Sequence, residues 1–183
     1  MFISKVPLRV SFLGGGSDLP EFYNKGNNGE VLGIAIKKHI CIYANQPEII
    51  DNNLIKYSIT ESFKKSNEIK HPLFREILSE YWDSNSKIEL GSFADIRSGT
   101  GLGSSSAFAV ALIGLLLRLK NQNFTPYSLC KAGFKIEREI LNDKVGLQDG
   151  AFAAYGGCCH FEFGKGNKID HKTVNISEDI LNT

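Results

Sequence analysis

Three glycines alternate with other residues in the stretch GTGLGSSSA, which occupies residues 99–107. Glycines let a backbone turn tightly and approach a ligand without a side-chain clash, and the apolar run at residues 107–117 is typical of a buried helix. N–H groups at the start of a helix lack partners within it, and the helix dipole adds partial positive charge there. This combination predicts a phosphate-binding loop at a helix N-terminus. We expect its contacts to come from Arg97, Gly99, Gly101, Leu102, Gly103, Ser104, Ser105 and Ser106.

The charges around this loop favour an anion. Residues 96–136 contain no Asp or Glu, but they contain the cations Arg97, Arg118, Lys120, Lys131 and Lys135. A Walker-type loop would need a lysine, and a dinucleotide fingerprint a glycine, at the position that Ser104 occupies. Both classes are therefore excluded. The remaining alternative is an ordinary glycine-rich turn in which Ser104 caps the helix.

Two carboxylates in the second half of the chain have the environment that catalysis or metal binding would need. Asp149 lies among small and apolar residues, where it could act as a base in a partly dry cleft, or it could cap a short helix that ends at Gly156. Glu137 lies beside the apolar stripe of an expected helix and has no Lys or Arg three or four residues away. Its partner is then a divalent metal, or an Arg or Lys distant in sequence.

The N-terminal residues bring polar groups to the end of a strand. Apolar and polar residues alternate over residues 2–13, which predicts a strand with Arg9 on the polar face, where it could simply be solvated. The following GGGSDLP, residues 14–20, ends regular pairing and presents Ser17 and Asp18. A carboxylate can accept two hydrogen bonds from neighbouring sugar hydroxyls. Alternatively, Ser17 or Asp18 caps a short helix over residues 19–24.

The rest of the chain predicts an alternation of strands and helices. Strands are expected at residues 31–45, 54–60, 88–94 and 158–163. Helices are expected at residues 72–82 and 107–117, and from Pro126, with Thr125 as its cap, to about residue 142. Residues after 166 carry no usable signal. A length of 183 residues suits one domain with a proper core, or two small ones.

Composition narrows the class of partner. The chain is 42% hydrophobic and 22% charged with a net charge of +1, which favours a globular protein and gives no support for nucleic-acid or membrane binding. A small molecule is the expected partner. The longest apolar run is too short to span a bilayer, and the N-terminus lacks the apolar region of a signal peptide. Four cysteines without Cys-x-x-Cys spacing predict reduced thiols in a cytoplasmic protein.

Three motifs, in this order along the chain, resemble the GHMP kinases, the family of galactokinase and of homoserine, mevalonate and phosphomevalonate kinases. The motifs are VPLRVSFLG at residues 6–14, GLGSSSA at residues 101–107, and GLQD with a later Gly-Gly pair at residues 146–157. The resemblance implies an α+β fold in which helices pack on a mixed β-sheet and the phosphate loop starts a helix. It also implies ATP and Mg²⁺ as ligands.

The resemblance assigns a role to each candidate residue. Asp149 matches the base for the attacking hydroxyl, and Arg9 matches a cation near that hydroxyl and the transferred phosphate. Ser105 and Glu137 match magnesium ligands. The segment containing Gly15, Gly16, Ser17 and Asp18 matches the sugar-binding region, with Asp18 as the carboxylate that binds hydroxyls.

Within the family, GGGSDLP resembles the sugar 1-kinases that act on D-glycero-D-manno-heptose 7-phosphate. We therefore expect ATP-dependent phosphorylation of the anomeric hydroxyl to the 1,7-bisphosphate, which leads to nucleotide-activated heptose for bacterial surface glycans. Family members run to roughly twice this length and carry a further glycine-rich motif in their second domain. We expect residues 1–183 to be the N-terminal domain alone, with weak or no activity in isolation. The alternative is a non-catalytic module that binds nucleotides or phosphosugars.

Overall fold

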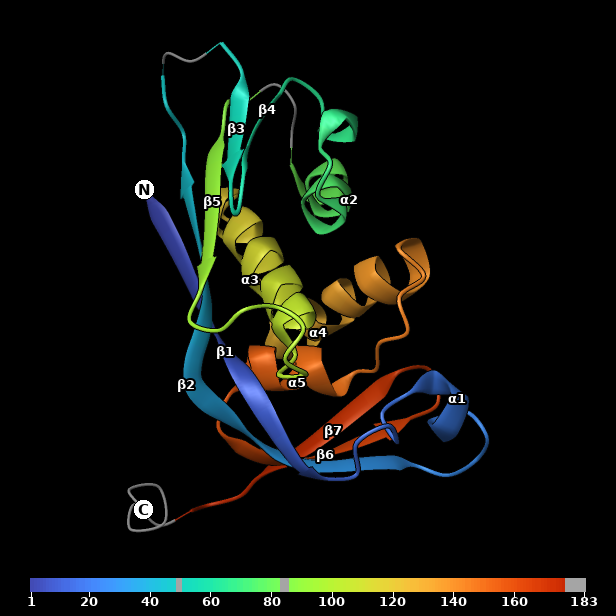
Figure 1. The fold of residues 1–183 in the computed structure, drawn as a ribbon. Coiled ribbons are helices and arrows are strands. Elements are labelled where there is room, and N and C mark those ends of the chain that lie inside the picture. The colour runs from blue at the N-terminus through green and yellow to red at the C-terminus, as the bar shows by residue number, and fades with distance from the viewer. Residues whose placement is uncertain (49–50, 83–85, 177–183) are drawn as a thin grey trace.

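Seven strands form one mixed sheet in the computed structural model, which describes residues 1–48, 51–82 and 86–176 (Figure 1). The strand order is β4-β3-β5-β2-β6-β7, and β1 pairs with β2. β3 and β5 are parallel, whereas the other paired strands are antiparallel. The strands are β1 (Phe2–Leu13), β2 (Gly29–Asn45), β3 (Asn53–Lys56), β4 (Thr60–Phe63), β5 (Glu89–Ala94), β6 (Cys158–Gly164) and β7 (Lys168–Thr173).

The helices lie mainly on one side of this sheet, which confirms the expected α+β architecture (Figure 1). A 3-10 turn spans Ser66–Glu68, and a π-helical segment, Lys135–Ile140, continues directly from α4. None of the helices in the described ranges is long and apolar enough to cross a membrane. The helices are α1 (Pro20–Tyr23), α2 (Pro72–Tyr81), α3 (Ser104–Leu119), α4 (Pro126–Phe134) and α5 (Gln148–Tyr155).

Most expected elements are present, with one correction and one addition. Residues 54–60 are not one strand, because the chain turns at Ser58 and Ile59 and returns as β4, closing a hairpin with a Tyr57 N–H to Ile59 carbonyl hydrogen bond of 2.9 Å. The residues after 166, which carry no usable signal in the sequence, include β7, which forms a hairpin with β6. Its polar sequence fits an outer strand, because only Ile169 of β7 is buried.

Strand β2 organises the sheet because it pairs with three other strands. Its register with β1 moves from Pro7↔His39 to Leu8↔Ile36, so Lys37 and Lys38 form a bulge. One end of β2 pairs with β5 and the other end with β6, and the strand bends between them (Figure 1). A bulge adds twist and bends a strand. β1 follows the bend and brings Arg9 toward the helices.

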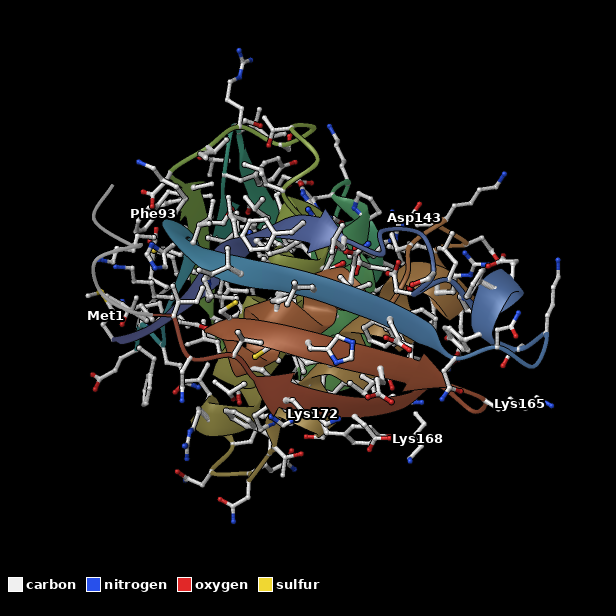
Figure 2. All side chains as sticks on the ribbon, turned by 90° about the horizontal axis from the view of Figure 1, so that it is seen from below. Met1, Phe93, Asp143, Lys165, Lys168 and Lys172 are labelled. Atoms are coloured by element: carbon white, nitrogen blue, oxygen red, sulfur yellow. The ribbon has the colours of Figure 1, made fainter. Side chains whose placement is uncertain are left out.

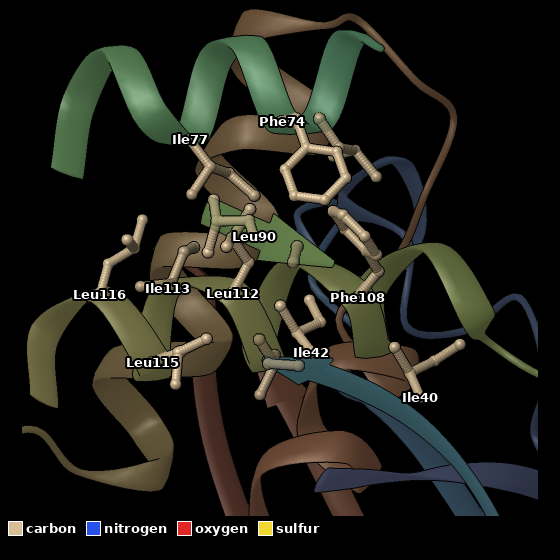
Figure 3. Close-up of a cluster of buried hydrophobic side chains, with 14 of the residues drawn as sticks. Ile40, Ile42, Phe74, Ile77, Leu90, Phe108, Leu112, Ile113, Leu115 and Leu116 are labelled. Atoms are coloured by element: carbon tan, nitrogen blue, oxygen red, sulfur yellow. The ribbon is translucent and has the colours of Figure 1, made fainter. Parts of the chain in front are cut away.

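Helix α3 is the central buried element. Residues 106–116 are all buried, which agrees with an apolar sequence on every side of the helix. Figure 3 shows Leu112 and Ile113 of α3 beneath Phe74 and Ile77 of α2, with Ile42 of β2 on the other side. The N-terminus of α3 is thereby held rigidly at the edge of the core.

None of the helices in the described ranges covers the face of β2, β6 and β7 that points away from α3 (Figure 2). Its side chains include Lys168 and Lys172 of β7 (Figure 2). Lys168 pairs with Asp170 at 2.6 Å, and Lys172 lies 3.8 Å from Glu162. Cations and carboxylates thus alternate along this face, which does not form a one-sign patch.

Candidate active site

The glycine-rich loop before α3 adopts a backbone that only glycine accepts readily. Gly99, Gly101 and Gly103 have φ values of 85°, 74° and 74°. In the described part of the chain, the N–H groups of residues 99–103 have no hydrogen-bond acceptor. The cap of α3 is Gly103 without any side-chain hydrogen bond, so Ser104 does not cap the helix as the alternative required. The loop and the first helical turn therefore present unpaired donors.

Asp149 lies directly against this loop. A Cβ atom built on Gly103 would be 3.1 Å from Cγ of Asp149, so the missing side chain leaves the space that the carboxylate uses. Asp149 sits in the first turn of α5, whose cap is Leu147 without a side-chain bond. Asp149 is thus not a helix cap. Its side chain keeps 24% of its surface exposed, enough for a reactant to reach it.

Arg9 joins Asp149 to the loop. Its Nε donates to Oδ1 of Asp149 at 2.8 Å, and its Nη2 lies 2.6 Å from the same oxygen. Its Nη1 donates to the carbonyl of Gly101 at 2.6 Å, and its backbone N–H donates to the carbonyl of Leu102 at 3.2 Å. The side chain is 14% exposed, so Arg9 is not a solvated residue of the sheet surface. Arg9 thus binds two carbonyl groups of the loop and leaves the loop N–H groups free of its own contacts.

Glu137 is buried beside the same helix terminus. It lies in the π-helical segment and is 1% exposed, and its Oε1 has no hydrogen-bond partner. Burial raises the pKa of Glu137, while the hydroxyls of Ser105 and Ser106 act in the opposite direction. No Lys or Arg pairs with Glu137 within the described residues. The structure therefore does not supply the distant cation that was the alternative partner.

Ser17 and Asp18 hold the residue 14–20 loop in place. The hydroxyl of Ser17 lies 2.7 Å from the carbonyl of Gly14 and accepts the Glu30 N–H at 2.9 Å. Asp18 is 2% exposed, and burial raises its pKa while the Gln148 N–H lowers it. Helix α1 is capped by Leu19 without a side-chain bond, so neither residue is a cap. Next to Gly15 and Gly16 there is open space for a ligand.

Sequence reasoning missed a cavity of about 620 Å³ beside the loop. Arg97, Ser98 and Gly99 form one end of it, and Tyr57, His71 and Phe108 line another part. His71 stacks on Phe108 with ring centroids 5.4 Å apart. Burial lowers the pKa of His71 and raises that of Tyr57 to about 12, so both side chains favour their neutral forms. These residues come from separate elements, and no local pattern connects them.

The sequence and the fold of this chain are similar to those of known proteins. Residues 68–157 match the model described as the GHMP kinases N terminal domain. This match, over 90 of the 183 residues, identifies a GHMP kinase N-terminal domain in the chain. The matched segment includes the glycine-rich loop, Glu137 and Asp149, but not Arg9 or Asp18.

One individual relative extends the likeness beyond that segment. D-glycero-alpha-D-manno-heptose 7-phosphate kinase of Campylobacter jejuni is 27% identical over 97% of this chain and 55% of the relative. Mevalonate kinase of Thermococcus gammatolerans is 36% identical over 49% of this chain and 27% of the relative. The chain thus spans just over half the length of the heptose kinase.

The fold is shared with solved sugar kinases. The crystal structure of a D-glycero-D-manno-heptose 1-phosphate kinase from Bacteroides thetaiotaomicron superposes with a TM-score of 0.87. Its sequence is 21% identical, and the superposition covers 98% of this chain and 62% of that one. At this identity the likeness shows the arrangement of strands and helices.

Proposed function

We propose that this chain is the nucleotide- and sugar-binding part of an ATP-dependent sugar kinase that phosphorylates the anomeric hydroxyl of D-glycero-D-manno-heptose 7-phosphate to give the 1,7-bisphosphate. The observation that carries the proposal is the contact between Asp149 and Gly103, which puts a carboxylate beside unpaired N–H groups. Phosphoryl transfer needs a positioned acceptor for the hydroxyl proton and positive groups around the phosphate, and both are present there.

The proposed step uses this chain's groups as follows. Asp149 accepts the proton of the anomeric hydroxyl while that oxygen bonds to the γ-phosphorus of ATP. The bond from γ-phosphorus to the β–γ bridging oxygen breaks, and ADP leaves with the electron pair. The loop N–H groups and the first turn of α3 bind the phosphate oxygens. Arg9 orients Asp149 and contributes positive charge beside the transferred group.

The residues around Glu137 fit a magnesium ion. Mg²⁺ is usually bound through one or two carboxylates together with substrate phosphates and water, so it does not need a full protein cage. No group of three or more His, Cys, Asp and Glu side chains that could hold a metal exists in the described ranges. Glu137, with an unpartnered buried oxygen, and Ser105 at the start of α3 would bind the ion. When bound, the ion neutralises phosphate charge.

The remaining contacts follow from the position of the loop. The aromatic cavity beside Arg97 and Gly99 would accept the nucleobase, because flat aromatic walls next to a phosphate loop suit a stacked ring. The sugar would lie on the other side of Asp149, near Gly15 and Gly16. The Campylobacter relative and the GGGSDLP segment are the two observations that support a heptose phosphate as the substrate. We place the product in the synthesis of nucleotide-activated heptose for surface glycans.

The test is phosphoryl transfer by the purified chain, followed by ³¹P NMR with ATP, Mg²⁺ and the heptose 7-phosphate. We expect a new anomeric phosphate to form slowly, in keeping with the weak activity expected of residues 1–183 alone. We expect Asp149→Asn to lower this rate further, at least about a hundredfold, while ATP affinity changes less than about threefold. The matched control is Asp170→Asn, an exposed carboxylate of β7 that should leave the rate unchanged.

Two results would contradict this proposal. ATP binding by the wild-type chain without any transfer would favour the alternative, a non-catalytic module that binds nucleotides or phosphosugars. Unchanged melting temperatures with phosphate, ATP and the sugar would show that the loop binds none of them.

A further inference from the structure

Both oxygens of the Asp18 carboxylate are engaged within the protein. Oδ1 accepts hydrogen bonds from the backbone N–H of Gly16 at 3.1 Å and from Nε2 of Gln148 at 3.0 Å. Oδ2 accepts the backbone N–H of Gln148 at 3.1 Å. The carbonyl of Asp18 also accepts the Leu147 N–H at 3.2 Å. Asp18 therefore connects the residue 14–20 loop to the start of α5 through three hydrogen bonds, and the fourth lies within the loop.

The side chain of Gln148 is fixed at both ends. Ser11 of β1 donates its hydroxyl to Oε1 of Gln148 at 2.6 Å, while Nε2 of Gln148 faces the Asp18 carboxylate. A carboxamide has one acceptor end and one donor end. The Asp18 carboxylate only accepts hydrogen bonds and therefore selects the orientation with Nε2 toward it, while the Ser11 hydroxyl donates to the other end. Ser11, Gln148 and Asp18 thus form a continuous chain of hydrogen bonds across the start of α5.

Gly146 closes the remaining side of Asp18. A Cβ atom at Gly146 would lie 1.9 Å from Oδ2 of Asp18 and 2.9 Å from its carbonyl oxygen. Backbone therefore covers the carboxylate on this side, and Asp18 as a whole is only 2% exposed. A sugar hydroxyl could reach it only if the hydrogen bonds to Leu147 and Gln148 opened.

Asp149 follows Gln148 in the chain, so the position of one constrains the other. We infer that Asp18 is a positioning residue, whose hydrogen bonds to Gln148 hold the Asp149 carboxylate against Gly103 and Arg9, and that it does not bind the sugar. The inference rests on the proposed function, because it assumes that Asp149 is the base. It replaces the sugar-binding role expected for Asp18, and it leaves the backbone near Gly15 to face the sugar.

The test exchanges the two ends of the hydrogen bond. Asp18→Asn and Gln148→Glu each destroy a donor–acceptor match between the two side chains. The double variant restores this pair in reverse, because the new carboxamide faces the new carboxylate, and only the Gly16 N–H then lacks its acceptor. We expect each single change to lower kcat at least about tenfold with the KM for heptose 7-phosphate changed less than about twofold. The double variant should recover most of the lost kcat.

A direct sugar contact predicts a different pattern. Asp18→Asn would then raise the KM for the sugar at least about tenfold with little change in kcat, and Gln148→Glu would not rescue it. That pattern would overturn the inference. If Asp18→Asn does not fold, Gln148→Met replaces it in the test, because this variant removes both side-chain hydrogen bonds of Gln148 and keeps Asp18. A lowered kcat with an unchanged KM for the sugar would then support the positioning role of Asp18. Asp143→Asn, an exposed change in the loop before α5, is the matched control.

Hydrogen exchange separates this inference from the proposed function. The N–H groups of Leu147 and Gln148 should exchange faster in Asp18→Asn than in wild type and regain protection in the double variant. This readout needs no catalysis. If the wild-type chain transfers no phosphate but shows this exchange pattern, the proposed function fails and the hydrogen-bond role of Asp18 stands. Unchanged exchange in Asp18→Asn would overturn the inference in either case.

Discussion

At the level of single residues, the surroundings of a side chain say more about its role in the site than its residue type does. Glu137 and Glu139 are two residues apart in one segment, yet Glu139 is exposed and Glu137 is 1% exposed with an unpartnered oxygen. Burying a carboxylate without a full set of hydrogen bonds costs free energy of folding. Glu137 is therefore tolerated at a cost, which fits a residue that is retained to bind a ligand.

Replacing Glu137 should separate stability from binding. Because burial raises the pKa of Glu137 above its ordinary value of 4.5, the folded chain is destabilised as pH rises from that value through the folded pKa. In EDTA near neutral pH, Glu137→Gln should raise the free energy of unfolding by about 1 kcal/mol, measured by urea denaturation. It should also weaken Mg²⁺-dependent ATP binding about tenfold in calorimetry.

Glu139→Gln is the control on the same segment, and it should change stability by less than about 0.5 kcal/mol with no effect on binding. Equal stability of the Glu137→Gln variant and the wild type would show that Glu137 carries no such cost.

At the scale of elements, the site lies at the N-terminal ends of three helices, and contacts from other segments hold these ends in place. α3 begins after the glycine-rich loop, and α5 begins beside Asp18. α2 begins directly after His71, which lines the aromatic cavity. His71 also caps α2, because its Nδ1 accepts the Phe74 N–H at 3.5 Å. Glu61 holds this segment by accepting the Lys70 N–H at 2.8 Å. The position of this cavity wall therefore depends on His71, a helix cap that can be protonated.

Acid should weaken this wall through His71. Burial lowers its pKa from 6.5, against the attraction of Glu61, so below that value the unfolded chain takes up a proton more readily than the folded chain. Stability that His71 contributes is present above pH 6.5 and is lost as pH falls toward the folded pKa. His71→Asn keeps a good cap and should cost about 1 kcal/mol at neutral pH through lost ring packing.

The measurement is urea unfolding at about pH 7.5 and about pH 5.5, where the wild type should lose more stability than His71→Asn. His171→Asn, at an exposed position of β7, should follow the wild type. A variant with the same pH dependence as the wild type would exclude His71 as its source.

For the whole molecule, the buried side chains form two clusters that share β2. The first lies between α2, α3 and the β3–β5–β2 part of the sheet, and the second surrounds Phe152 of α5 with residues of β6 and β7. Ile42 belongs to the first and Val31 to the second, on either side of the bend in β2. We propose that residues 1–183 form one domain with one cooperative unfolding transition.

A substitution in one cluster should then also lower the unfolding midpoint measured in the other cluster. Phe152 is fully buried in the second cluster, and Phe152→Leu should lower the free energy of unfolding by about 1–2 kcal/mol. Trp82, the only tryptophan of the chain, packs against the first cluster and reports on it by fluorescence. We expect the fluorescence and far-UV circular dichroism midpoints to move together. A fluorescence midpoint that stays in place would show two separate units.

The sequence alone determined the local features of this protein. Its alternating glycines select the positive φ values of the loop at Gly99, Gly101 and Gly103. Thr125 and Pro126 place the start of α4, where the Thr125 hydroxyl accepts the Ser128 N–H. The three motifs identified the family and its fold, because each is a short stretch whose residue types and spacing are readable without knowledge of the rest of the chain.

Only the tertiary structure decided what the site residues touch. Arg9 meets Asp149 across 140 positions of sequence, and Asp18 meets Gln148 across 130. A carboxylate looks the same in sequence whether it faces a ligand or is enclosed by backbone, so the pattern that predicted a sugar contact for Asp18 could not detect its burial. The aromatic cavity at His71 and Phe108 was likewise invisible, because its walls come from separate elements that meet only when the sheet and α3 pack.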